Sequence, residues 1–207
     1  GGTSGDVKGF SWPTWLEKEA MPVSRLTREY KSKLANLKGM VDLISGGPPC
    51  QGFSLAGRRN KDDPRNKLTS QYREVVSLVK PRFLLLENVL GFNIPFSETK
   101  KITVGRKKKK QSYAQVVAKR LAELGYNVFS QTIRSVDYGV PQRRPRFLMI
   151  AIKKGELTSV ELTKRTPFDV LAKLRGSFLK SKQLNPKKPV SVSEAISDLQ
   201  VKGKRLI

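Results

Sequence analysis

Apolar residues form two short uninterrupted runs, and each run predicts a buried β-strand. The first begins at Val41 and enters a Gly/Pro-rich turn at residues 46–49, so we expect a strand that ends in an exposed loop. The second run is Arg82–Glu87. Its continuous aliphatic character is typical of a parallel strand that is covered on both faces of its sheet.

Helical spacing of apolar residues lies between these strands and after them. We predict a helix over Thr69–Val79, ended by Lys80–Pro81, and a second helix capped by Ser112 with Gly125 just past its end. Residues 12–38 carry weaker helical patterning. The two apolar faces are Tyr72, Val75, Val76 and Val79 in the first helix, and Val116, Val117, Leu121 and Leu124 in the second.

Two further strands are expected at Tyr126–Ile133 and Arg146–Ile152, joined by a turn at Asp137–Gln142. They lie close enough in sequence to form an antiparallel hairpin. Because strands and helices alternate along the chain, the pattern predicts an α/β layered fold with a mixed sheet.

The composition removes several classes of chemistry. The 207 residues include one cysteine and no histidine, so a Ser-His-Asp triad, a Cys-His pair, His-ligated zinc, a Cys-only metal site and an internal disulfide cannot be built within this chain. We therefore expect no metal site. A single free thiol suits a reducing, intracellular compartment.

The single cysteine, Cys50, lies in the Gly/Pro-rich turn after the first strand. A buried, inert thiol is the alternative to a reactive one. Two glycines and two prolines fix an unusual backbone path rather than fill a core, which favours a displayed nucleophile. Without histidine, nearby arginine or lysine and a helix N-terminus are the groups that could favour its thiolate.

Basic residues outnumber acidic ones by 41 to 17, which gives a formal net charge of +24. A polyanion, with nucleic acid as the first candidate, is the expected partner, although charge alone does not separate DNA binding from general solubility. No apolar stretch of about 20 residues is present, so we expect no membrane span. The run Gly105–Lys110 could contact DNA, but a solvated loop is the simpler interpretation.

Charged side chains also follow the other predicted strands. Glu87 stands at the carboxyl end of the second strand, where ligands bind in open α/β sheets, although it could merely cap the strand or pair with a lysine. Arg144 and Arg146 enter the last strand at a spacing of two, which points both to one face of an extended segment. Together they could grip a phosphate, a carboxylate or a base edge.

Three segments in this order closely resemble motifs of the DNA cytosine-5 methyltransferase family. They are the catalytic-loop motif at Gly47–Ser54, the Glu-Asn-Val motif at Glu87–Val89 and the arginine motif at Tyr138–Arg146. The resemblance covers about Val41–Leu199, with an insert at Asn93–Lys110. It implies a Rossmann-like, S-adenosylmethionine-dependent methyltransferase fold with a C-terminal antiparallel hairpin.

The resemblance also implies a covalent mechanism. Cys50 would add to C6 of a cytosine flipped out of double-stranded DNA, and Glu87 would hydrogen-bond or protonate N3, so that C5 can take a methyl group from S-adenosylmethionine. Arg144 and Arg146 would bind the base, its phosphate or Glu87. Further residues follow from the same resemblance: Pro49, Gln51, Ser54, Arg58 and Arg59 toward the base and the DNA backbone, and Asp6, Val7 and Pro49 toward the cofactor.

Parts of the family pattern are absent from these 207 residues. The glycine-rich cofactor turn is not found before Cys50, and a complete target-recognition region does not follow residue 199. We therefore divide the chain into residues 1–40, which could end the cofactor-binding half, a catalytic core at 41–155, and residues 156–207 leading toward target recognition.

A fragment, half of a split enzyme that needs a complementary chain, and a catalytically incomplete DNA-binding remnant stay open as alternatives. Methylation of tRNA cytosine is less favoured, because the related enzymes differ after Cys50, where this chain has Gly52-Phe53-Ser54. The motif spacing resembles restriction-modification enzymes, which favours a bacterial cytoplasm or nucleoid, with the nucleus as the compartment in a eukaryote.

Overall fold

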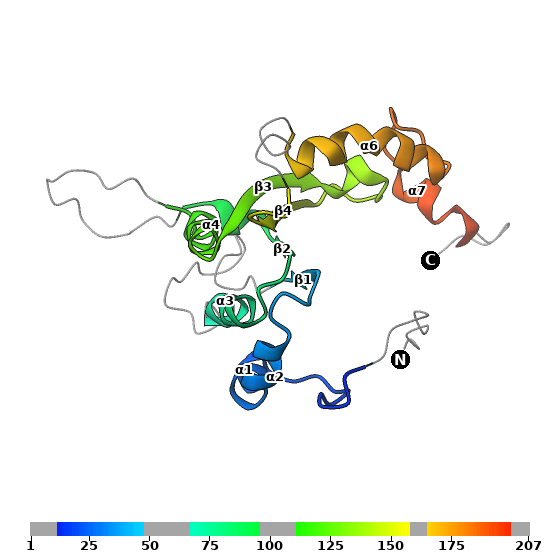
Figure 1. The fold of residues 1–207 in the computed structure, drawn as a ribbon. Helices are drawn as coiled ribbons and strands as arrows, with labels where there is room; N and C mark the ends of the chain where they lie inside the picture. Colours follow the sequence, from blue (N-terminus) through cyan, green and yellow to red (C-terminus); the bar gives the residue numbers. More distant parts are fainter. Residues whose placement is uncertain (1–11, 48–66, 96–110, 158–164, 200–207) are drawn as a thin grey trace, which may run out of the picture.

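A computed structural model of the chain describes residues 12–47, 67–95, 111–157 and 165–199 (Figure 1). Its strands form one mixed sheet in the order β1-β2-β4-β3. β1 runs parallel to β2, and β4 lies antiparallel between β2 and β3. The strands are β1 Leu43–Gly46, β2 Phe83–Asn88, β3 Tyr126–Arg134 and β4 Pro145–Lys153. The α/β class and the antiparallel pairing of the last two strands are thereby confirmed.

The helices agree with most of the sequence predictions. α3 follows β1, and α4 leads into β3 (Figure 1). None of the helices in the described ranges is long and apolar enough to cross a membrane. The helical segments are α1 Val23–Glu29, α2 Lys31–Asn36, α3 Lys67–Val79, η2 Leu90–Asn93, α4 Tyr113–Glu123, η3 Ser135–Tyr138, α6 Pro167–Ser181, α7 Val192–Ala195 and η4 Ser197–Leu199.

The predicted cap of α4 is present. The Ser112 hydroxyl accepts a hydrogen bond from the Gln115 amide at 3.2 Å, and the Gln115 side chain accepts one from the Ser112 amide at 2.9 Å. These two bonds satisfy amide groups that the first turn of a helix leaves without partners. Gly125, with φ of +93°, follows the last turn, where a residue with a Cβ would be strained.

The hydrophobic core covers one face of the sheet. Alternate β2 and β4 residues, such as Leu86 and Met149, are buried against α3 and α4. Leu85, on the opposite face of β2, is only partly buried, and burial along β2 alternates. The prediction that this strand is covered on both faces is therefore wrong for the described part of the chain, in which no helix lies over Leu85 closely enough to bury it.

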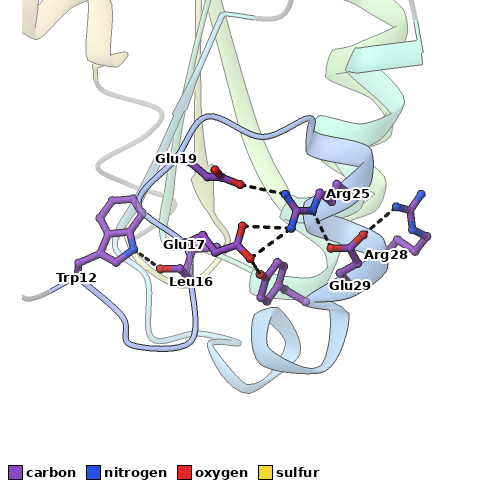
Figure 2. A network of polar contacts seen from close by, with 8 residues as sticks. Trp12, Leu16, Glu17, Glu19, Arg25, Arg28 and Glu29 are labelled. Atoms are coloured by element: carbon purple, nitrogen blue, oxygen red, sulfur yellow. Dashed lines mark hydrogen bonds and ion pairs between the residues drawn. The ribbon is translucent and has the colours of Figure 1, made fainter. Parts of the chain in front are cut away.

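The segment before the sheet is held by an ion-pair network around Arg25, shown in Figure 2. The Arg25 guanidinium bonds to Glu29 at 2.8 Å within α1, and to Glu17 and Glu19 at 3.1 Å each. Hydrogen bonds from Arg25, and secondly from Arg28, lower the pKa of Glu29. The network ties the residues before α1 to that helix at a solvent-exposed surface.

Tyr126 joins the start of β3 to the segment that precedes β2. Its side chain is 2% exposed, and its hydroxyl donates a 2.7 Å hydrogen bond to the Pro81 carbonyl. Burial raises the pKa of Tyr126 to about 12. This bond fixes the end of α3 and the beginning of β2 relative to β3.

We predict that Tyr126→Phe lowers the free energy of unfolding by about 1–3 kcal/mol, because the Pro81 carbonyl loses a buried partner. Urea denaturation at neutral pH measures it. Tyr138→Phe is the matched control, since the Tyr138 hydroxyl has no hydrogen-bond partner among the described residues. The difference in unfolding free energy between wild type and Tyr126→Phe should shrink as the pH rises from about 10 to about 12, because the phenol loses its proton at a lower pH in the unfolded chain than in the folded one. Equal stability of Tyr126→Phe and wild type would contradict this role.

Candidate functional site

The carboxyl ends of β1 and β2 lie side by side and bring two predicted motifs together. Gly46 is in register with Leu86, so Gly47 lies beside Glu87. A Cβ built on Gly47 would lie 3.6 Å from Glu87 Oε2 and 3.7 Å from the Glu87 carbonyl oxygen. The segment that leads into Cys50 therefore starts against the Glu87 carboxylate.

Arg146 reaches the same carboxylate from β4. Its Nε lies 2.7 Å from Glu87 Oε1, with 18% of the arginine side chain and 48% of the glutamate side chain exposed. Glu87 is paired with Leu148 across the β2–β4 ladder. Because side chains alternate along a strand, Arg146 and Leu148 share a face, and the ion pair is a diagonal contact on it. A single salt bridge thus links two of the predicted motifs.

The two carboxylate oxygens of Glu87 have different surroundings. Oε1 is bound by Arg146, whereas Oε2 is the oxygen that faces Gly47. The arginine fixes the orientation of the carboxylate because a guanidinium N–H bond is directional. The second oxygen is left on the side from which the Cys50 segment departs.

Arg144 is placed differently from Arg146. It precedes β4, and its carbonyl accepts 3.1 Å hydrogen bonds from the Ser135 amide and the Ser135 hydroxyl. Its side chain is exposed and contacts no polar partner within the described residues. Arg146 therefore lies within β4 and binds Glu87, whereas Arg144 lies just before that strand.

Tyr72 is a residue at the site that the sequence analysis treated only as part of an apolar helix face. A Cβ on Gly46 would lie 2.7 Å from Tyr72 Cε2, so the ring covers the backbone at the end of β1. Burial raises the pKa of Tyr72. Its hydroxyl is buried and has no hydrogen-bond partner among the described residues. The glycine at position 46 is therefore required by close packing of this ring.

Asn88 shapes the chain just after Glu87. It is 2% exposed, and its Oδ1 accepts a 2.9 Å hydrogen bond from the Val89 amide. Its side chain lies on the core face of β2, opposite to Glu87. The asparagine of this motif thus holds the backbone on which Glu87 is presented.

Several predicted site residues lie outside the described residues. They are Asp6, Val7, Pro49, Cys50, Gln51, Ser54, Arg58 and Arg59, and the basic run Gly105–Lys110 lies outside as well.

Cofactor and metal contacts are not assigned to the described residues. The described part of the chain also contains no cluster of three His, Cys, Asp or Glu residues that could hold a metal ion.

The Glu87–Arg146 pair gives a prediction for stability. The double variant Glu87→Gln/Arg146→Met should lose less free energy of unfolding than the two single variants lose together. The coupling in this double-mutant cycle should be about 0.5–1 kcal/mol, because the pair is partly solvent-exposed. Urea denaturation at low ionic strength measures the coupling. The matched pair Glu87→Gln and Arg144→Met should show none. Additive effects of Glu87→Gln and Arg146→Met would mean that the two side chains do not interact in solution.

The comparisons with known proteins agree with the geometry. The model of the C-5 cytosine-specific DNA methylase family matches residues 16–204. Among curated proteins, the type II methyltransferase M.DdeI of Desulfomicrobium norvegicum is 35% identical over 161 residues, which are 78% of this chain and 33% of that protein. M.AquIA of Picosynechococcus is 35% identical over 160 residues, which are 77% of this chain and 60% of that protein.

A solved structure supports the same fold. A protein of an E. coli prophage, described as a DNA modification methyltransferase, superposes with a TM-score of 0.52 and 26% identity over 85% of this chain and 40% of that chain. The chain thus spans a third of M.DdeI and well under half of the prophage protein. The predicted methyltransferase fold with a mixed sheet is confirmed. With nine-tenths of its length matched by one family model, the chain belongs to the C-5 cytosine-specific DNA methylase family.

Proposed function

We propose that the protein to which this chain belongs transfers a methyl group to C5 of a flipped-out cytosine in double-stranded DNA, with Cys50 as the nucleophile. The observation that carries the proposal is the placement of the Glu87 carboxylate between Arg146 and Gly47, three residues before Cys50. Family membership supports the reaction class. Residues 41–155 are the proposed catalytic core.

C5 of cytosine is a weak carbon nucleophile, and its activation needs a covalent step. The Cys50 thiolate adds to C6, and the electron pair of the C5–C6 bond moves onto C5 and the ring. S-adenosylmethionine, when bound, supplies the methyl group. Loss of the C5 proton and departure of the Cys50 thiolate then restore the aromatic ring as 5-methylcytosine.

Glu87 has the role of stabilising the charge that develops on the base. We propose that Oε2 carries a proton and donates it in a hydrogen bond to cytosine N3, because Oε1 is already bound by Arg146. A preoriented group costs no reorganisation when charge develops during the reaction. Arg146 therefore orients the carboxylate, and Arg144, whose side chain is exposed, is the arginine available to the base or its phosphate.

The remaining predicted residues keep their proposed partners. Pro49 and Gln51 of the Cys50 motif are assigned to the base. Ser54, Arg58 and Arg59 are assigned to the DNA backbone, and Asp6, Val7 and Pro49 to the cofactor. The net charge of +24 supports binding of a polyanion in a salt-dependent way. A cytosine inside a duplex cannot be reached at C6, so the proposal includes base flipping. A DNA-acting enzyme of this kind works inside the cell.

A split or incomplete enzyme is the second candidate. β1 is an edge strand of the described sheet, and its Leu43 side chain is 54% exposed. Since the chain spans only a third of M.DdeI, a complementary chain or further sequence would supply the cofactor and recognition elements. A DNA-binding remnant remains the non-catalytic alternative.

Methyl transfer to duplex DNA by the complete gene product tests the proposal. We expect 5-methylcytosine to form in wild type, no product with Cys50→Ala, and a loss of about 10²–10⁴-fold in kcat with Glu87→Gln, the range for a lost acid–base or charge-stabilising group. Glu74→Gln, on the exposed side of α3, is the matched control and should retain full activity. If the wild-type gene product binds duplex DNA but transfers no methyl group, the DNA-binding remnant is favoured instead.

A further inference from the structure

The turn between β3 and β4 carries Arg144 and is closed by its own hydrogen bonds. Ser135 donates to the Arg144 carbonyl, and the Val140 amide donates to the Ser135 carbonyl at 3.3 Å. Arg134 pairs with Asp137 at 2.9 Å within the same turn. These bonds define the shape of the turn but do not hold it against the rest of the molecule.

Arg175 of α6 connects this turn to the rest of the molecule. Its Nε donates to the Asp137 carbonyl in the turn, and its Nη2 donates to the Pro186 carbonyl at 3.2 Å. Arg175 is partly buried, and both acceptors are backbone oxygens. One guanidinium therefore joins the turn, α6 and the segment after α6.

Apolar packing reinforces the same junction at Gly139. This residue has φ of +87°, and a Cβ built on it would lie 2.5 Å from Leu184 Cδ1 and 3.2 Å from Leu179 Cδ2. Leu179, in the last turn of α6, is buried, and the Leu184 amide donates a hydrogen bond to the Leu179 carbonyl at 2.9 Å. The turn therefore meets α6 without room for a larger residue at position 139.

We infer that Arg175 is a positioning residue, which holds the β3–β4 turn so that Arg144 is presented at the edge of the sheet where Glu87 and Arg146 lie. The inference rests on the proposed function and adds to it a residue outside the three motifs. Guanidinium geometry is required, because its fork of N–H groups serves two carbonyls at once, which an ammonium on a flexible stem does less well. Its loss leaves the Asp137 and Pro186 carbonyls without this donor.

The test compares Arg175→Ala and Arg175→Lys in the complete gene product with Lys173→Ala, which removes one charge from the exposed surface of the same helix. We expect kcat of methyl transfer to fall about tenfold in Arg175→Ala with KM for duplex DNA within twofold, about threefold in Arg175→Lys, and unchanged in Lys173→Ala. Backbone amides of residues 135–144 should exchange hydrogen faster in Arg175→Ala, to a smaller extent in Arg175→Lys, and at the wild-type rate in Lys173→Ala. A thermal melt confirms that each variant is folded.

Each outcome decides the inference. Unchanged exchange of residues 135–144 in Arg175→Ala would overturn it, and so would a rise in KM with constant kcat, which would make Arg175 a DNA contact. If Arg175→Ala does not fold, Arg175→Lys takes its place: a partial kcat loss with faster exchange of residues 135–144 supports the inference, and unchanged exchange overturns it. Absence of methyl transfer in wild type would count against the proposed function instead, while the exchange comparison would still establish or remove the contact between α6 and the turn.

Discussion

The position of β2 in the sheet is the constraint on which the candidate site depends. Leu84, Leu86 and Asn88 are buried on the core face, so Glu87 must lie on the other face. A slip of one residue would bury the carboxylate and expose the leucines. The parallel partner β1 and the antiparallel partner β4 are both set by this register. Packing of the core thus decides where the chemistry lies, and it places Gly47 and Arg146 at the same carboxylate.

Side chains next to the site convert this register into a defined geometry. Tyr72 packs onto Gly46 so closely that no Cβ fits there, which fixes the last residue of β1 before the Cys50 segment. Arg146 binds one oxygen of Glu87 and leaves the other toward Gly47. Core packing therefore sets the positions of the backbone at the site, and only the orientation of the Glu87 carboxylate depends on a polar contact at the partly exposed edge of the sheet.

Much of this arrangement could be predicted from the sequence, because apolar periodicity, the Ser112 cap and Gly125 mark α3, α4 and the strands directly. The helix α6 was missed, although Thr166 and Asp169 form a capping box and Pro167 begins the helix. Its exposed apolar residues obscure the helical face. That β4 includes Arg146 but not Arg144 depends on where the strand begins, and element boundaries are set by tertiary hydrogen bonds such as that from Ser135. No local pattern contains that information.

The most direct measurement of the central claim, that Cys50 attacks a cytosine beside Glu87, is covalent trapping on duplex DNA containing 5-fluorocytosine. Fluorine at C5 cannot leave as a proton does, so the adduct persists after methyl transfer. With S-adenosylmethionine and the complete gene product, peptide mapping should place the modified base on Cys50, and Cys50→Ser should form no adduct. An adduct that survives Cys50→Ser would contradict the account.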